Sequence, residues 1–312
     1  MIYIFTALYP EAKPLIRAFS LKKAVTGLPF DVYENTDSSP EQDLRLVVTG
    51  VGAAAAACGV AAVLGKYGTG DRDHLINIGT CAAENLPCDK NDDTKAGDRE
   101  IYLCHKITDR NTGRTYYPDM LYHHSFAEAE IITEPVVWKS GIEQNVKTGD
   151  RNTMPDATQI MKCEQILLHD MESVAVYQAG SFWLGPHQMS FIKVVSDEGA
   201  GEKITPQTLE CVVENNIEQI KAYVSDLGQA LKPDEEQLRK EQYCMIVAER
   251  LCQELHCSRT MRAAVVQCVR YWTLAEVNYQ KVLDEMRADG KLPCHDRREG
   301  KKRFEELKQR LL

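Results

Sequence analysis

Short apolar runs alternate with segments of helical apolar spacing along the first 230 residues of the chain. The runs are interpreted as buried strands, and they span residues 2–7, 44–48, 75–78 and 191–195. An alanine-rich helix is predicted over residues 53–64. A second helix is predicted after Asp170, and its apolar face gathers Met171, Val174, Ala175, Ala179 and Phe182. Such alternation is typical of an α/β fold with a parallel sheet.

Small or polar residues follow each predicted strand, where parallel sheets bind their ligands. The four junctions are Leu8-Tyr9-Pro10-Glu11, Thr49-Gly50-Val51-Gly52, Gly79-Thr80-Cys81-Ala82-Ala83 and Ser196-Asp197. Glu172 adds a carboxylate in the first turn of the second predicted helix. Ser-Asp before glycine is also common in plain loops, so Asp197 alone leaves a turn cap and a ligand contact equally open. Four such junctions at one sheet edge favour a binding site.

The motifs that recur in order along the chain are Ala7 with Glu11, residues 49–52, residues 77–82, Gly97-Asp98, Met171-Glu172 and Ser196-Asp197. This set resembles the nucleoside phosphorylase and nucleosidase superfamily, in particular its methylthioadenosine/S-adenosylhomocysteine nucleosidase branch. Residues 112–119 and His124-Ser125-Phe126 are similar to clostridial members associated with spore photoproduct lyase. The resemblance implies a phosphorylase-like three-layer α/β/α fold with a central mixed, partly barrel-like sheet.

Composition is that of an ordinary cytoplasmic enzyme. With 312 residues, 44% hydrophobic and 27% charged, the chain can bury a large core and exceeds one typical domain. No apolar run is long enough for a membrane span, and Glu11 and Lys13 interrupt the region where a signal peptide is apolar. Eleven scattered cysteines, among them Cys58, Cys163 and Cys268 in apolar segments, favour reduced core thiols. A net charge of −9 disfavours nucleic-acid binding.

The chain changes character near Pro233, after a helix predicted from Pro206 to Leu231. From Pro233 onward, 16 Lys and Arg stand against 14 Asp and Glu, so this tail carries +2 and residues 1–232 carry −11. Helices are predicted over 235–255, from Ser258 to Trp272, from a Thr273/Glu276 capping box to Gly290, and from Arg303 to the end. We therefore expect a phosphorylase-like catalytic domain at 1–232 and an all-α C-terminal extension at 233–312.

Two features of the tail carry weak functional signals. Cys252, His256 and Cys257 lie close together, with Cys294-His295 beyond, but no Cys spacing repeats as zinc modules require, so no metal is predicted. The basic cluster within residues 297–303 is interpreted as a solvated helix start, although contact with a phosphate backbone or an acidic partner stays open. The tail is expected to pack on the catalytic domain or on a protein partner.

Cleavage of a purine N-glycosidic bond needs an acid that protonates the leaving base. Asp197 suits this role, since closure of the site by a ligand would raise its pKa by desolvation. The resemblance implies that Asp197 protonates the purine with Ser196 placing it. It also implies that Glu172 binds the ribose and Met171 forms an apolar floor beside the sugar. No cofactor is expected.

The choice between hydrolysis and phosphorolysis depends on the first and third junctions. Phosphate binding needs cations, typically arginines, but these junctions carry Glu11 and Thr80 instead. The resemblance implies that Glu11 activates a water, which favours a hydrolase over a phosphorylase. Lys13 and Lys193 leave a differently supplied cation possible.

The base and 5′ sides of the site are less legible. A strand is predicted over 130–138, with Trp138 or Val137 as the base platform, and residues 139–160 are interpreted as a lid. The resemblance places Leu8 and Val51 on the apolar ribose and 5′ side and Thr80 and Ala82 beside the substrate. It implies a 5′-deoxyadenosine, methylthioadenosine or S-adenosylhomocysteine substrate, and a homodimer formed in part by residues 116–118 and the loop after His124.

Two readings from other classes remain as alternatives. Gly50-Val51-Gly52 with Ala55 could be a dinucleotide fingerprint, with Asp71 or Asp73 contacting the ribose. A noncatalytic nucleoside-binding scaffold, with the tail as its interaction part, is the other. Retention of Glu11, Glu172 and Asp197 argues against both.

Overall fold

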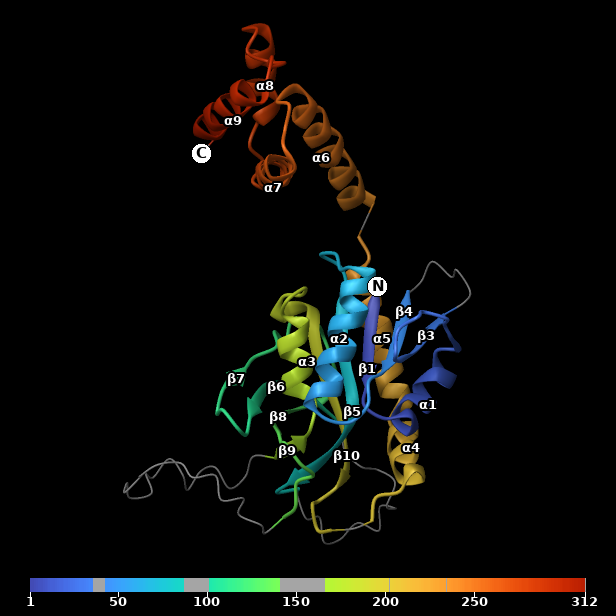
Figure 1. Ribbon diagram of the computed structural model, residues 1–312. Helices are drawn as coiled ribbons and strands as arrows, with labels where there is room; N and C mark the ends of the chain where they lie inside the picture. The colour runs from blue at the N-terminus through green and yellow to red at the C-terminus, as the bar shows by residue number, and fades with distance from the viewer. Residues whose placement is uncertain (36–42, 87–100, 141–165, 202, 234, 312) are drawn as a thin grey trace, which may run out of the picture. The chain divides into compact units, whose positions relative to one another are not determined.

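The computed structural model describes residues 1–35, 43–86, 101–140, 166–201, 203–233 and 235–311. These residues form two compact units, Met1–Lys232 and Pro233–Leu312, which we call unit 1 and unit 2 (Figure 1). Gly97-Asp98, Cys163 and nearly all of the expected lid at 139–160 lie outside the described residues.

The centre of unit 1 is a run of four parallel strands. They are β4 (Leu44–Val48), β1 (Ile2–Thr6), β5 (His74–Glu84) and β10 (Met189–Asp197), paired in that order. Every residue of β1 and β10 is buried, which is typical of parallel strands covered on both faces. The predicted parallel arrangement of the four apolar runs is confirmed, and their carboxyl ends meet at one edge.

The rest of the sheet is mixed and partly closed. Strands β6 (Ile101–Asp109), β8 (Ala127–Thr133) and β9 (Leu167–Asp170) complete a closed ring in the order β5-β10-β6-β8-β9. Strand β7 (Thr115–Tyr116) pairs with β6, and β3 (Asp31–Asn35) and β2 (Leu21–Lys23) extend the sheet beyond β4. The mixed, partly barrel-like sheet implied by the resemblance is confirmed.

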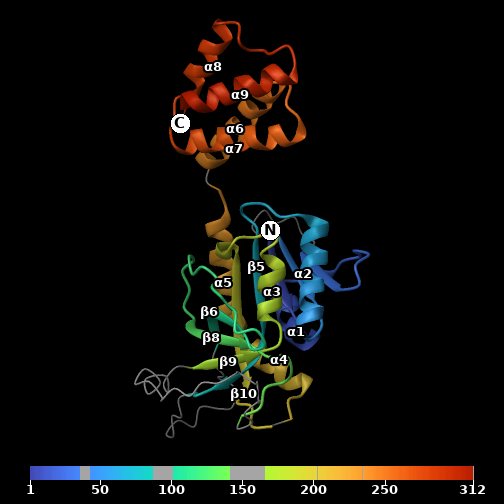
Figure 2. The same cartoon turned by 60° about the vertical axis from the view of Figure 1, so that its left-hand side comes forward.

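Helices cover both faces of the sheet and so make two of the three layers. Figures 1 and 2 show α2 (Ala53–Tyr67) and α3 (Ser173–Gly180) together on one face. The other face carries α1 (Tyr9–Ala18), α4 (Pro206–Asn215) and α5 (Ile217–Leu231), and a short 3-10 helix spans Pro186–Gln188. Each face has its own apolar core: Phe5, Val60 and Val174 belong to the first, and Ile4, Leu15 and Val224 belong to the second.

Several predicted boundaries in unit 1 are wrong for local reasons. The helix expected from Pro206 to Leu231 breaks at Asn216, whose side-chain amide donates to the Val212 carbonyl at 2.9 Å. Helix α3 ends at Gly180, so Phe182 is 83% exposed instead of lying on the apolar face. The strand predicted over 130–138 is β8, which ends at Thr133, because Pro135 has no N–H to continue the ladder.

Unit 2 consists of four helices around an apolar core. They are α6 (Glu235–Glu254), α7 (Arg259–Leu274), α8 (Tyr279–Ala288) and α9 (Arg297–Leu311). Ser258 caps α7 as predicted, accepting from the Met261 N–H at 3.3 Å. The Thr273/Glu276 capping box is wrong, because Thr273 lies inside α7 and donates to the Val269 carbonyl, while Asn278 caps α8. Helix α9 begins six positions before the predicted Arg303, so the basic cluster is part of it.

Free thiols occur in both units. The nine described cysteines are free, but Cys58 is exposed on α2 and Cys268 is only partly buried, so their predicted core positions are wrong. No group of metal-ligating side chains occurs among the described residues. None of the described helices combines the length and the apolar character that a membrane crossing needs.

Candidate active site

Three of the predicted carboxylates lie at the edge where β1, β5 and β10 end. Glu11 is in the first turn of α1, Glu172 directly precedes α3, and Asp197 is the last residue of β10. Their exposed fractions are 2%, 8% and 9%. Buried carboxylates at the ends of parallel strands are typical of functional sites, because folding alone gains little from them.

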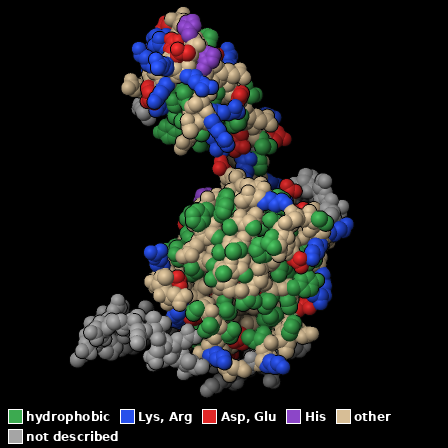
Figure 3. Space-filling model, in the orientation of Figure 1, with side chains coloured by type: hydrophobic (Ala, Val, Ile, Leu, Met, Phe, Trp, Pro, Cys, Tyr) green, Lys and Arg blue, Asp and Glu red, His purple; other side chains and the backbone are tan. Residues whose placement is uncertain are grey.

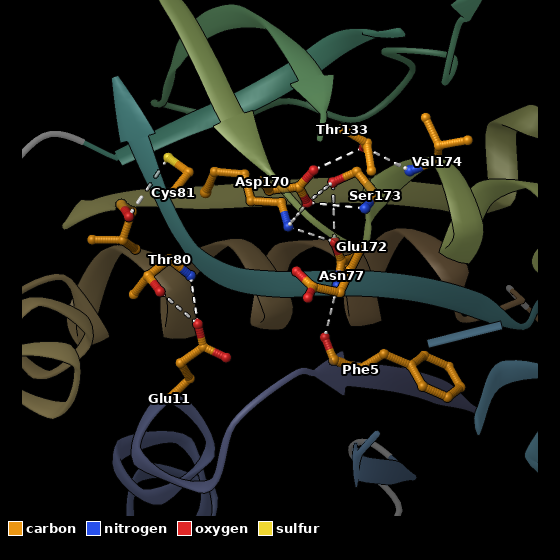
Figure 4. Close-up of polar contacts among 12 residues, drawn as sticks. Phe5, Glu11, Asn77, Thr80, Cys81, Thr133, Asp170, Glu172, Ser173 and Val174 are labelled. Atoms are coloured by element: carbon orange, nitrogen blue, oxygen red, sulfur yellow. Dashed lines mark hydrogen bonds and ion pairs between the residues drawn. The ribbon is translucent and has the colours of Figure 1, made fainter. Parts of the chain in front are cut away.

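Glu11 is held on both oxygens by fixed donors. Its Oε1 accepts from the Thr80 N–H at 2.8 Å and from the Thr80 hydroxyl at 2.7 Å, and its Oε2 accepts from the Leu8 N–H at 2.9 Å. Figure 4 shows the Glu11 carboxylate turned toward Thr80 on β5. The structure thus brings together the residues of the first and third predicted junctions, and Gly79 leaves room for the Glu11 side chain.

Glu172 is the N-cap residue of α3 and not a member of its first turn as predicted. Its Oε1 accepts from the Gly52 N–H at 2.7 Å, which joins the second junction to α3. Gly52 has a φ of 95°, a conformation that a side chain would strain, so glycine is needed to aim this N–H. Burial, together with repulsion from Asp170 and Glu11, raises the pKa of Glu172 to about 7. Near neutral pH both protonation states of this carboxyl are accessible.

A buried ion pair supports the site. The sequence interpretation kept Lys193 only as a possible cation for phosphate and did not pair it with Asp170. The Lys193 Nζ donates to Asp170 Oδ2 at 2.8 Å and to Asn77 Oδ1 at 2.7 Å. Burial alone would raise the pKa of Asp170, but Lys193 and the hydrogen bonds from Ser173 and Thr133 hold it below its usual range. Burial would likewise lower the pKa of Lys193, and attraction to Asp170 and Glu172 raises it instead. A lysine inside the apolar run 191–195 was the available signal.

Asp197 ends β10, where prediction placed it just past the strand. Its Oδ2 lies 2.8 Å from the Ser196 hydroxyl, and its Oδ1 accepts from the Gly199 N–H at 2.9 Å. The Ser196 hydroxyl also lies 3.1 Å from the Cys81 carbonyl oxygen. Both carboxyl oxygens are therefore fixed in orientation, and Asp197 is in register with Ala82 of the neighbouring strand.

Trp138, predicted as a base platform, lies beside the Asp197 turn. Its ring stacks on the His169 imidazole with centroids 4.2 Å apart and planes 4° apart, and a β-carbon at Gly199 would overlap the indole. Val137, the other candidate, is 64% exposed. Of the remaining predicted contacts, Met171 and Leu8 are partly buried next to Glu172 and Glu11 in the chain, and Val51 is 50% exposed.

The dinucleotide reading does not fit the structure. Asp73 directly precedes β5 and accepts from the N-terminal amine at 3.0 Å and from the Gly70 N–H at 2.7 Å. It therefore lies at the amino ends of the parallel strands, as does Asp71, whereas Gly50 and Gly52 follow the carboxyl end of β4. A dinucleotide-binding acid must lie at the carboxyl ends.

Comparison with known proteins establishes the fold. No protein-family model and no curated protein sequence matches the chain. Similar solved structures include 5′-methylthioadenosine/S-adenosylhomocysteine nucleosidases from Helicobacter pylori (10% identity) and S. pneumoniae (17%), each with a TM-score of 0.51. A third is 5′-methylthioadenosine nucleosidase from Arabidopsis thaliana, with 18% identity and a TM-score of 0.50. Each alignment covers 72% of this chain and 97%, 99% and 95% of the respective structures.

Proposed function

We propose that unit 1 is a catalytic domain that hydrolyses the N-glycosidic bond of a purine nucleoside. The observation that carries this proposal is the set of three buried carboxylates, Glu11, Glu172 and Asp197, at one edge of a nucleosidase-like sheet. A purely structural role would leave the burial of these three acids without a purpose, because folding gains little from buried carboxylates. The reaction proposed needs no cofactor.

Asp197 is the general acid in this proposal. As the bond to the base breaks, Asp197 transfers its proton to the purine, and this step typically accelerates such reactions by a hundredfold or more. Ser196 supports both protonation states, because a hydroxyl both donates and accepts hydrogen bonds. The Gly199 N–H on Oδ1 then stabilises the carboxylate that remains.

Glu172 binds the ribose and stabilises its developing positive charge. Its pKa of about 7 reflects burial near other acids, and a cationic sugar beside it favours the ionised form. The stabilisation is therefore stronger in the transition state than in the ground state, which is what catalysis requires. Met171 lies beside it as the floor of the sugar site.

Glu11 activates the attacking water, with Thr80 as its orienting partner. Three fixed donors leave the Glu11 carboxylate oxygens in one orientation, with free lone pairs for a water. The two lysines considered for phosphate are each paired with a carboxylate: Lys13 bonds Glu210 at 2.8 Å and Lys193 bonds Asp170. Hydrolysis is therefore favoured over the runner-up, a purine nucleoside phosphorylase.

The substrate proposed is an adenosine derivative with an uncharged 5′ substituent. Leu8 and Val51 offer apolar surface on the ribose and 5′ side, and a phosphate there would be desolvated without a cation. The sharpest candidate is 5′-deoxyadenosine, followed by methylthioadenosine and S-adenosylhomocysteine. The clostridial subfamily resemblance motivates this order.

The test is release of free base from these nucleosides and from AMP, with and without phosphate. We expect base release from 5′-deoxyadenosine or methylthioadenosine at rates orders of magnitude above that from AMP, independent of phosphate. Formation of a ribose 1-phosphate product only when phosphate is added would replace the hydrolase by the phosphorylase. Binding without turnover would favour the noncatalytic scaffold.

We further propose that unit 1 forms a homodimer through α2 and α3. Figure 3 shows apolar side chains in the middle of the face over these helices, with charged groups mainly at its rim. Residues 53–65 of α2 carry no charge, Phe182 and Trp183 are exposed nearby, and Tyr116 packs on Tyr177 of α3. The segment 116–118 is thereby continuous with this face, and the loop after His124 is proposed to add to it.

The oligomeric state tests this interface. Sedimentation of the native chain is expected to give a dimer, and Ala54→Glu on the exposed side of α2 is expected to give a monomer. A monomeric native chain with full activity would remove the interface.

Unit 2, with its own core, is proposed as a helical extension that can dock a protein partner. The whole protein is proposed to act in the cytoplasm.

A further inference from the structure

A buried histidine with one unused ring nitrogen lies beside the proposed base site. His169 is 3% exposed, and its Nε2 has no hydrogen-bond partner among the described residues. Glu84 Oε1 lies 3.8 Å from Nε2, which is beyond hydrogen-bond distance. A buried polar atom without a partner is costly, and a ligand in the proposed base site would supply one for Nε2. His74 Nδ1 also lacks a partner among the described residues, but it lies at the start of β5, at the opposite end of the strand.

The hydrogen bonds around His169 determine what Nε2 can recognise. Its Nδ1 lies 2.9 Å from Glu134 Oε1, and Glu134 is 2% exposed and bound by Arg110 at three distances from 2.7 to 3.1 Å. A carboxylate paired with arginine accepts hydrogen bonds, so Nδ1 carries the proton. Burial lowers the pKa of His169, which favours the neutral ring. In that tautomer Nε2 is an acceptor, and it therefore needs a donor.

The position of His169 places this acceptor near the proposed general acid. His169 on β9 and Asp197 on β10 are both register partners of Ala82, one on each side of β5. The Trp138 ring lies parallel to the imidazole and extends to Gly199, whose N–H binds Asp197. The Ser140 N–H also donates to the Gly199 carbonyl at 2.9 Å, which ties this segment to the Asp197 turn.

The parallel planes of His169 and Trp138 connect the Nε2 acceptor, unpaired among the described residues, with the indole surface beside it. A hydrogen bond to Nε2 lies in the plane of the imidazole, which is parallel to the Trp138 indole. A flat base that lies in this plane can therefore donate to Nε2 and also present its face parallel to the indole. Parallel, offset rings are the favoured stacking arrangement. One edge of the base then meets Nε2 and another faces the turn that carries Asp197.

We propose that His169 is a specificity-determining residue that accepts a hydrogen bond from the 6-amino group of the purine, with Trp138 stacking on the base. This inference rests on the proposed function and names the residue that selects the base. A 6-oxo group has no proton to donate there, and a 6-hydrogen purine leaves Nε2 unpaired. Adenine nucleosides are therefore preferred over both.

The test compares three nucleosides that differ only at position 6: amino, hydrogen and oxo. For the native chain we expect kcat/KM to fall roughly tenfold or more on losing the amino group. His169→Val removes the acceptor, and the preference of amino over hydrogen is expected to disappear. His169→Gln retains an acceptor oxygen but can rotate to donate. It is expected to keep the preference over hydrogen and to lose that over oxo.

A binding measurement separates this inference from the proposed hydrolysis. Free adenine, purine and hypoxanthine are titrated against the native chain and both variants by calorimetry, with thermal unfolding to confirm that each variant is folded. If no nucleoside is hydrolysed, the proposed function fails, and the adenine-to-purine affinity ratio still decides the role of His169. A ratio that is the same in the native chain and in His169→Gln and His169→Val overturns it, as does a native preference for hypoxanthine.

His74→Val is the matched control. His74 is also a fully buried histidine on this sheet, but it begins β5, at the opposite end, and its Nε2 bonds the Ser190 hydroxyl at 2.8 Å. Its loss is expected to lower stability without changing the base preference. An equal change of preference in His74→Val and His169→Val would show a general effect of losing a buried histidine, and would overturn the inference.

Discussion

The two ends of the parallel strands treat buried ionisable groups in opposite ways. At the amino ends, burial lowers the pKa of His74 to about 3, so the ring stays neutral and joins a chain through the hydroxyls of Ser190 and Tyr223. At the carboxyl ends, Glu11, Asp170 and Glu172 gather around Lys193 and the pKa of Glu172 rises to about 7. The buried histidine at the first end is kept neutral, whereas the second end gathers several buried acids around one lysine, which marks the second end as the place for chemistry.

The largest expected effect is the loss of stability caused by Lys193→Met, which removes the cation from the carboxyl ends of the strands. Removing the lysine leaves Asp170 and Glu172 without their cation, and breaking one partner of a buried pair typically costs about 3–5 kcal/mol. Lys13→Met is the control, because the Lys13–Glu210 pair is partly exposed, with side-chain exposures of 37% and 24%, and such pairs contribute about 1 kcal/mol or less. Urea unfolding of both variants measures the difference, and equal losses would contradict a special role for the buried pair.

The next effect concerns turnover. Asp197→Asn cannot donate the proton and is expected to lower kcat by roughly a hundredfold or more, with thermal stability close to native. Asp73→Asn alters an acid at the opposite end of the same sheet and is expected to leave kcat unchanged. An Asp197→Asn variant with native kcat would refute the general-acid assignment.

The smallest effect is a pH dependence of stability from Glu172. Because its folded pKa of about 7 exceeds the usual 4.5, the unfolded chain releases this proton first as pH rises. The stability that the protonated form contributes is therefore complete below about pH 4.5 and is lost as the pH passes through about 7. Glu172→Gln, which cannot ionise, is expected to unfold at the same temperature as the native chain near pH 5 and a few degrees above it at pH 8. A melting difference that does not grow with pH would show that the raised pKa is wrong.

Local patterns carried most of what the sequence could predict. The parallel strands, α2 and the positions of Glu11 and Asp197 follow from short apolar runs and the turn residues directly after them. The Lys193–Asp170 pair and the stacking of Trp138 on His169 join side chains from separate segments of the chain, so no local spacing encodes them. The N-cap of α8 is predicted at the wrong residue, because Thr273 and Asn278 can both cap a helix and lie close together in the sequence. The structure includes Thr273 in α7, which leaves Asn278 as the cap.

The closed ring of strands bears on how the chain acquires the proposed activity during folding. The contacts that assemble the site join residues far apart in sequence: Lys193 with Asn77 across 116 positions, Glu172 with Gly52 across 120, and Glu11 with Thr80 across 69. Contacts of this separation form slowly, because the loop between them must lose its conformational freedom before the contact forms. A refolding chain is therefore expected to regain helical signal well before it regains turnover. The return of enzymatic activity should report closure of the ring, a late event that far-UV spectroscopy does not resolve.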